Sequence, residues 1–194
     1  MKYPEFFDAI EHIVLVDGLS ALLGSTEEGI IDYSYLEIVK MAGHSCAVVS
    51  GAYIMTLKGL KELYGNEMPK RGEIKVELRE QLTDGNTGVF AAVYSNITGA
   101  TTNTGFGGLG GSFNRRNLLF YNVGMKGNVR FTRLDTQQSV ELVYNPALAV
   151  NPGEIMQSAF GPNANEESRK SFPKKWQQMV KTIFDNADKV VSIV

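Results

Sequence analysis

The sequence is poor in the side chains that bind metals and form covalent cross-links. It contains one cysteine, Cys46, and two histidines, His12 and His44, among 194 residues. A single cysteine excludes an intrachain disulfide framework and any zinc or iron–sulfur site built from four thiolates of one chain. Soft-ligand chemistry is therefore confined to three side chains.

Long apolar runs and an excess of basic residues are also missing. No apolar run approaches the ~20 residues that a helix needs to span a bilayer, and the first residues lack the apolar stretch of a signal peptide. The chain has 19 Lys and Arg against 21 Asp and Glu, whereas a nucleic-acid-binding protein normally carries a clustered basic surface. We therefore expect a cytoplasmic protein that binds neither nucleic acid nor membrane.

What is present is the composition of a globular domain, with 43% hydrophobic and 21% charged residues. Helical spacing of apolar residues predicts helices at 5–23, 33–41, 45–64, 152–160 and 166–187. Strands are predicted at 72–82, 118–123, 128–134 and 139–144. The stretch 88–97 fits either a buried helix or a strand, and we favour a helix.

This order of elements predicts an α+β fold rather than a doubly wound sheet. We expect a mainly antiparallel or mixed sheet of about four strands, packed against the long helix of residues 45–64. Residues 1–150 would form the core domain with its N-terminal helix, and residues 151–194 a C-terminal helical extension.

The segment Gly43-His44-Ser45-Cys46 lies between two predicted helices. An imidazole and a thiolate two residues apart can reach one divalent ion if the backbone turns there, and zinc suits such ligands. A third ligand would have to come from elsewhere, and the candidates are His12, Asp17, Asp32, Asp84 or a neighbouring protomer. The alternative is that Cys46 is a small buried apolar residue and that His44 and His12 only make hydrogen bonds.

The seven residues from Gly105 to Gly111 include five glycines, and Arg115 and Arg116 follow. The segment lacks the Lys-Ser/Thr ending of a P-loop and the strand–turn–helix frame of a dinucleotide site. We expect a mobile flap beside the metal site, where Thr101, Gly105 and the two arginines would bind a small anionic ligand. The alternative is two solvated surface arginines.

Two further hypotheses concern catalysis and assembly. A cysteine–histidine nucleophile is disfavoured because His44 and Cys46 are too close along the chain for the usual arrangement. The apolar helical faces are generous for a monomer core, which predicts a homodimer. The residues that carry this expectation are Phe6, Phe7, Trp176 and Met179.

Several motifs together resemble one known family. A helix leads into Gly43-His44-Ser45-Cys46 and then into a helix that carries Gly51-Ala52-Tyr53; Ile97-Thr98-Gly99-Ala100-Thr101 and Asn117-Leu118 follow later. Over about residues 33–145 this pattern resembles the FmdE-like family of formylmethanofuran dehydrogenase components, with its Gly-His-x-Cys-Pro-Gly and Leu-Thr-Gly-Cys-Thr segments. The resemblance implies a fold of the kind shared with the catalytic domain of glyceraldehyde-3-phosphate dehydrogenase.

The chain also departs from that family. Ala42 stands where the family has a histidine, Ala47-Val48 replaces the Pro-Gly pair, Ala100 replaces a cysteine, and the C-terminal zinc ribbon is missing. Only His44 and Cys46 carry over as metal ligands. The resemblance therefore implies a metal-binding accessory protein, with zinc or another divalent transition metal. The alternatives are a metal-dependent enzyme acting on a small anionic or carbonyl-containing ligand, and a dimeric module that has lost its metal.

Overall fold

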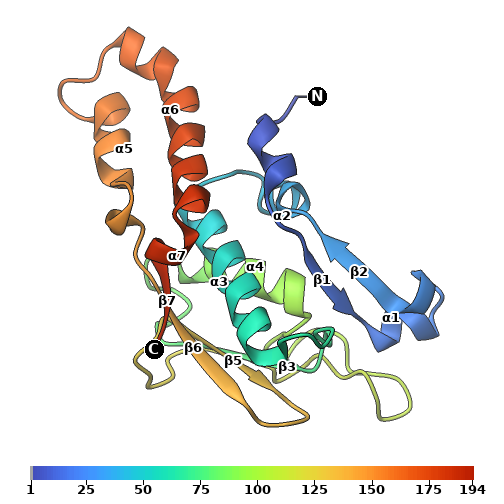
Figure 1. The fold of residues 1–194 in the computed structure, drawn as a ribbon. Coiled ribbons are helices and arrows are strands. Elements are labelled where there is room, and N and C mark those ends of the chain that lie inside the picture. The colour runs from blue at the N-terminus through green and yellow to red at the C-terminus, as the bar shows by residue number, and fades with distance from the viewer. Residues whose placement is uncertain (1) are drawn as a thin grey trace.

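The computed structural model describes residues 2–194 and has an α+β fold, as predicted. A five-stranded mixed sheet packs against helices, and a separate two-stranded hairpin lies beside it (Figure 1). The sheet order is β4-β3-β5-β6-β7, in which only the β3–β4 pair is parallel. These strands are β3 (Ile74–Leu78), β4 (Leu119–Phe120), β5 (Val129–Arg133), β6 (Ser139–Tyr144) and β7 (Val191–Ile193).

The helix predicted over residues 5–23 is wrong. The segment instead contains the 3₁₀ helix η1 (Glu5–Ala9), strand β1 (Ile13–Val16) and the short helix α1 (Gly18–Leu22). Strand β1 pairs antiparallel with β2 (Ile30–Tyr33), which follows the 3₁₀ helix η2 (Glu27–Gly29). The β-branched run of β1 favours a strand, in which alternate residues are buried.

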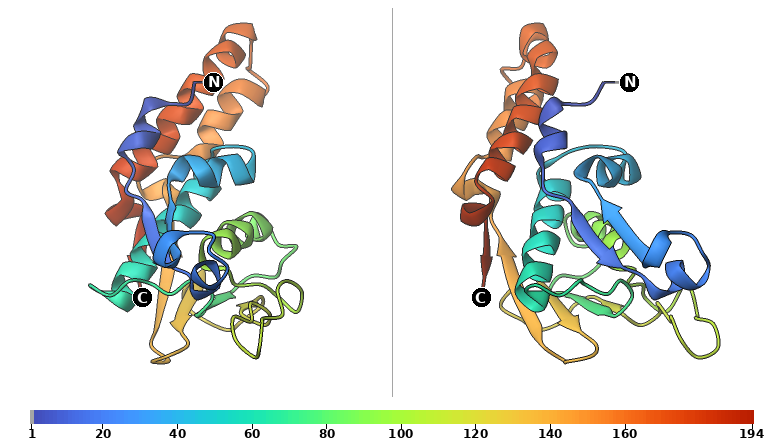
Figure 2. Two further views of the ribbon diagram at one scale, coloured as in Figure 1. Left: turned by 90° about the vertical axis from the view of Figure 1, so that its right-hand side faces the viewer. Right: turned by 45° about the vertical axis from the view of Figure 1, so that its right-hand side comes forward.

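Helix α3 (Ala47–Tyr64) forms the centre of the molecule, and Figure 2 shows it lying across one face of the sheet. It packs against β6 and against the helices α2 (Tyr35–Ala42), α4 (Thr87–Thr98) and α6 (Glu166–Asp185). Glycines allow its close approach to the sheet, since a Cβ at Gly59 would lie 2.7 Å from the ring of Phe131. Helices α2, α3 and α4 confirm the helices predicted there, including the helix favoured for residues 88–97.

The C-terminal segment begins as a projecting helical arm and ends as an edge strand of the sheet. Figure 1 shows α5 (Pro152–Phe160) and the first half of α6 projecting away from the sheet. Later residues of α6 are buried, among them Met179 and Ile183, and β7 then pairs with β6. The 3₁₀ helix η3 (Pro146–Leu148) precedes the arm, and α7 (Ala187–Val190) precedes β7. Strand β7 explains why the sheet has one strand more than predicted.

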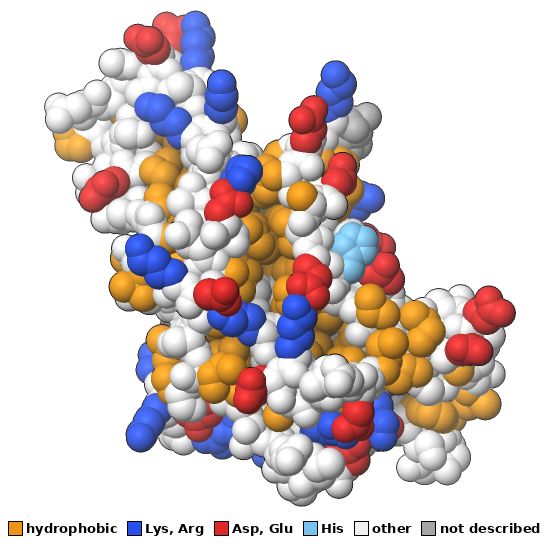
Figure 3. All heavy atoms as spheres, viewed as in Figure 1, with side chains coloured by type: hydrophobic (Ala, Val, Ile, Leu, Met, Phe, Trp, Pro, Cys, Tyr) orange, Lys and Arg blue, Asp and Glu red, His pale blue; other side chains and the backbone are white. Residues whose placement is uncertain are grey.

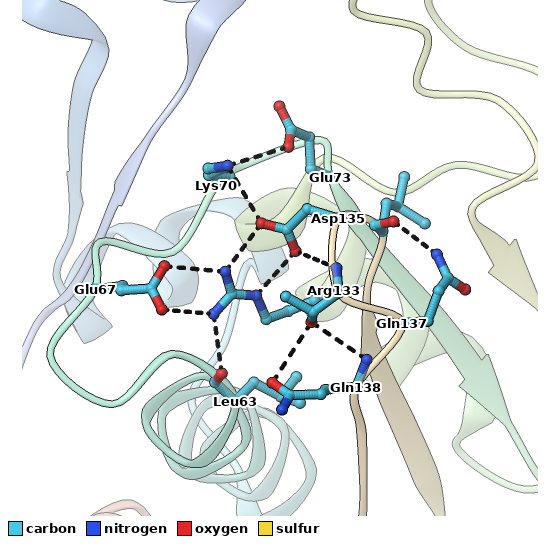
Figure 4. A network of polar contacts seen from close by, with 10 residues as sticks. Leu63, Glu67, Lys70, Glu73, Arg133, Asp135, Gln137 and Gln138 are labelled. Carbon is cyan, nitrogen blue, oxygen red and sulfur yellow. Dashed lines mark hydrogen bonds and ion pairs between the residues drawn. The ribbon is translucent and has the colours of Figure 1, made fainter.

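A polar network fastens the end of α3 to the turn between β5 and β6 (Figure 4). The guanidinium of Arg133 donates to both carboxylate oxygens of Glu67 at 3.2 and 3.0 Å and to both of Asp135 at 3.0 and 2.9 Å. It also lies 4.1 Å from the ring centroid of Tyr64. Because all its donors face fixed partners, this arginine is structural. Within residues 2–194, no helix has the length and apolar character required to cross a membrane.

Candidate functional site

The segment Gly43–Cys46 is held tightly at the start of α3. Gly43 ends α2 in the left-handed conformation with φ of 78°, which glycine adopts without strain. Cys46 is the N-cap residue of α3, and its buried sulfur accepts a hydrogen bond from the Val49 N–H at 3.5 Å. The Ser45 carbonyl accepts from the Trp176 indole at 3.0 Å. Cys46 therefore caps helix α3 through its sulfur.

Each of the two histidines forms a hydrogen bond through its Nδ1. His44 is exposed, and its Nδ1 donates to the Ala42 carbonyl at 3.0 Å. His12 lies at the start of β1, where its Nδ1 is 2.9 Å from an Asp32 carboxylate oxygen. Among residues 2–194, no group of three or more His, Cys, Asp or Glu is placed to hold a metal ion. The structure therefore does not assemble His12, His44 and Cys46 into a three-ligand centre.

Arg115 is buried rather than placed at the surface of the glycine-rich loop. Its Nη2 donates to Asp17 at 2.6 Å and its Nη1 donates to the Arg71 carbonyl at 2.7 Å. Arg71 donates to the other Asp17 carboxylate oxygen at 2.9 Å. Burial alone would raise the pKa of Asp17, but the Arg71 hydrogen bond and the Arg115 charge hold that pKa below its ordinary value. Asp17 is thus bound by two arginines and is not a free metal ligand.

The other predicted anion-binding residues are tied to the loop itself. Arg116 is exposed, and its Nε donates to the Gly105 carbonyl at 2.7 Å. The Thr101 hydroxyl lies 2.7 Å from the carbonyl oxygens of both Thr104 and Arg115 and can donate its proton to either one. The predicted anion site therefore retains one exposed guanidinium, that of Arg116.

The glycine-rich loop packs against the N-terminal hairpin. Leu109 and Ser112 exchange two backbone hydrogen bonds of 2.9 Å, and the Phe113 ring lies against Gly18 of α1. In Figures 1 and 2 the loop lies towards the C-terminal end of α3, beside the hairpin, whereas the link between α2 and α3 lies at the N-terminal end of α3. The predicted flap is therefore not beside His44 and Cys46.

A cavity of about 360 Å³ opens where α4 begins. It is formed by the turn before α4, the first turns of α4, and the ends of β3 and β6. Its lining residues are Leu78, Glu80, Asp84, Gly85, Asn86, Thr87, Phe90, Tyr94, Asn128 and Tyr144. The Phe90 ring centroid lies 6.2 Å from those of both Tyr94 and Tyr144, so three aromatic side chains form one wall.

Several polar groups of this cavity have no partner in the described part of the chain. Thr87 is only 6% exposed and its hydroxyl forms no hydrogen bond among residues 2–194, but the hydroxyl oxygen is not fully buried and so reaches solvent. Asn86 is the N-cap residue of α4 but makes no capping hydrogen bond with its side chain. The start of α4 thus differs from that of α3, where the Cys46 sulfur is used.

The two cavity tyrosines are anchored by their hydroxyl groups. Tyr144 donates to the Ala47 carbonyl at 2.6 Å, which joins the cavity wall to the first turn of α3. Tyr94 makes a longer contact of 3.7 Å with the Met55 sulfur. Burial raises the pKa of both phenols above the ordinary value for tyrosine, so both are neutral near pH 7. Their rings are fixed walls rather than acids or bases.

A second hollow is the groove between α6 and the N-terminal segment. Figure 3 shows apolar side chains along its floor and charged side chains along its rims. Its volume is about 440 Å³. Three lysines line the groove, and each one pairs with a carboxylate. The pairs are Lys58–Asp188, Lys61–Glu11 and Lys181–Asp185. The charged groups here already have partners, unlike the polar groups at the start of α4.

Of the cavity residues, the sequence singled out Asp84 alone, and as a candidate metal ligand. The signal available was a polar turn at residues 83–86 before a helix, which is common in proteins without any site. Neither the known protein families nor the curated proteins that were compared with this chain provide a match.

Proposed function

We propose that this protein binds a small organic molecule in the cavity at the start of α4. The observation that carries the proposal is a cavity with three aromatic side chains on one wall, beside Thr87 and Asn86, whose side chains make no hydrogen bond within residues 2–194. A volume of about 360 Å³ falls within the range of small-molecule sites.

The lining suits a ligand with an apolar body and a few polar atoms. Phe90, Tyr94 and Tyr144 offer apolar surface, while Thr87 and Asn86 offer hydrogen-bonding groups at one end. Ligand sites of this type use apolar contact for affinity and a few polar groups for orientation. Because the tyrosine hydroxyls are anchored, the wall is preorganised and loses little side-chain entropy on binding.

A fragment screen by ligand-observed NMR tests the proposal with two matched variants. Asn86→Trp places an indole at the cavity without removing a side-chain capping bond, because Asn86 makes none. Asn163→Trp adds the same indole at an exposed turn between α5 and α6. We expect fragments to bind the wild type and Asn163→Trp but not Asn86→Trp. Equal binding to all three proteins, or no binding to the wild type, contradicts the proposal.

A second proposal concerns a divalent metal such as zinc at His44. The Ala42 carbonyl can only accept, so the proton of neutral His44 lies on Nδ1 and the Nε2 lone pair is available. Metal-binding histidines commonly donate their other N–H to a carbonyl in this way. We propose that Cys46 and a second copy of the chain provide further ligands, which would also give the homodimer.

Zinc titration followed by light scattering tests this second proposal. Zinc should raise the mass above 21.3 kDa for the wild type but not for the His44→Ala, Cys46→Ser double variant. His12→Ala is the control, since the His12 ring is already paired with Asp32. Equal zinc content in the wild type and the double variant would rule out these ligands.

The relation to the FmdE-like family of formylmethanofuran dehydrogenase components also stands as a proposal, together with the glyceraldehyde-3-phosphate-dehydrogenase-like fold that it implies. It is supported by the position of the Gly-His-Ser-Cys segment directly before the long helix α3 and by the packing of α3 against the sheet. An experimental structure superposed on a member of that family would test it.

A further inference from the structure

We propose that the ligand of the α4 cavity is an organic cation, a primary or substituted ammonium group carried on an apolar, preferably aromatic, body. This inference rests on the proposed function and names the class of molecule that the cavity binds. It follows from the charges that line the cavity, from its unused hydrogen-bond acceptors and from its aromatic wall.

The charges that line the cavity are of one sign. Glu80 and Asp84 carry carboxylates, and of the described residues that line the cavity none is lysine or arginine. Glu80 is 2.8 Å from the Arg79 guanidinium, an exposed pair that neutralises much of its charge. Asp84 forms no ion pair within residues 2–194, and its carboxylate accepts only the Gln81 N–H at 3.3 Å.

The start of α4 opposes this negative charge only in part. A helix N-terminus carries the equivalent of roughly half a positive charge. The full charge of the Asp84 carboxylate exceeds it, so the field at the cavity mouth favours a cation over an anion. An anionic ligand would meet Asp84 and Glu80 without any lining cation to compensate.

The unused acceptors match the donors of an ammonium group. The Thr87 hydroxyl can accept a hydrogen bond, as can the Asn86 side-chain oxygen and the Asp84 carboxylate. A primary ammonium has three donors and can satisfy several oxygens at once. Phe90, Tyr94 and Tyr144 add π faces, which attract cations and also accept an aromatic body.

Isothermal titration with three probes of similar shape and different charge tests this inference. Near neutral pH benzylamine is a cation, benzyl alcohol is neutral and benzoate is an anion. We expect benzylamine to bind the full chain about three- to ten-fold more tightly than benzyl alcohol, and benzoate to bind weakest. Asp84→Asn and Glu80→Gln should reduce benzylamine binding to the level of benzyl alcohol, whose own affinity should stay unchanged.

The outcomes separate the ligand class from the site itself. If benzylamine and benzyl alcohol bind equally well, or benzoate binds best, the cationic class is overturned. The site nevertheless stands, provided that Asn86→Trp abolishes binding of these probes. If no probe and no screened fragment binds the wild type, both the proposed function and this inference fail. The three substituted side chains are exposed, so each variant should fold like the wild type. Far-UV circular dichroism checks this.

Discussion

The two ends of helix α4 have opposite character. At its C-terminal end the Arg71 guanidinium donates to the carbonyls of Ile97 and Asn96, each at 3.1 Å, and Asp17 binds both Arg71 and Arg115. At its N-terminal end, Thr87 and its neighbours face a cavity with unused hydrogen-bonding groups. One end is saturated by the protein, and the other keeps side chains that form no hydrogen bond in the described chain.

This difference shows that a charged residue is not a functional residue by its type alone. Arg115, near the C-terminal end, was predicted from the sequence to bind an anionic ligand. Its guanidinium instead donates to Asp17 and to the Arg71 carbonyl. Thr87, at the N-terminal end, was not a candidate in the sequence, yet it lines the cavity and its hydroxyl makes no hydrogen bond in the described chain.

Removing the carboxylate at the saturated end should have the largest effect. Asp17→Ala leaves two guanidinium groups without their anion and should lower the free energy of unfolding by about 3–5 kcal/mol. At the other end, Asp84→Ala should change it by less than about 1 kcal/mol, because Asp84 is exposed and unpaired. Urea unfolding measures both values. Equal losses would remove the contrast between the two ends.

Protonation of Asp17 at low pH should also destabilise the wild-type protein at this end of α4. The pKa of Asp17 is lowered in the fold, so its contribution is complete above the unfolded value of about 3.9 and is lost as pH falls through the folded value. The free energy of unfolding of the wild type should therefore fall more steeply below about pH 4 than that of Asp17→Asn. Parallel acid-unfolding curves for the two proteins would contradict this reasoning.

A smaller effect is expected at the wall of the cavity. Tyr144→Phe leaves the Ala47 carbonyl without its 2.6 Å donor and should lower the free energy of unfolding by about 1–2 kcal/mol. Tyr94→Phe removes only a 3.7 Å contact with sulfur and should have less than about half that effect. Urea unfolding of the two variants provides the comparison. A larger loss for Tyr94→Phe would mean that the Tyr94 hydroxyl contributes more to stability than the Tyr144 hydroxyl does.

The smallest expected difference in stability is between variants of two asparagine N-cap residues, Asn165 and Asn86. At α6 the Asn165 side chain accepts from the Ser168 N–H at 2.8 Å, so Asn165→Ala should lower the free energy of unfolding by about 1 kcal/mol. Asn86→Ala should lower it by only a few tenths, because no such bond exists at α4. Thermal unfolding of the two variants tests this difference. Similar losses would mean that Asn86 contributes to the stability of α4 in another way.

Local sequence patterns predicted those helices that carry their own start and stop residues. Ser34 and Glu37 form a capping box at the start of α2, and Gly43 ends that helix in the left-handed conformation. The same reasoning failed over residues 5–23, where apolar side chains at helical spacing come from a 3₁₀ helix and a strand. Their spacing matched a helix by coincidence, because pairing with β2 overrides local propensity.

The sequence by itself determined the α+β class, the long helix α3 with Cys46 at its start, and the scarcity of metal ligands. These properties depend on local spacing, on residue counts and on capping residues. Only the tertiary structure decided that Arg115 meets Asp17, 98 positions away, and that Thr87 is buried beside Tyr144 without a partner. Contacts between residues so far apart depend on how the elements pack, and no local pattern records which polar group is left over.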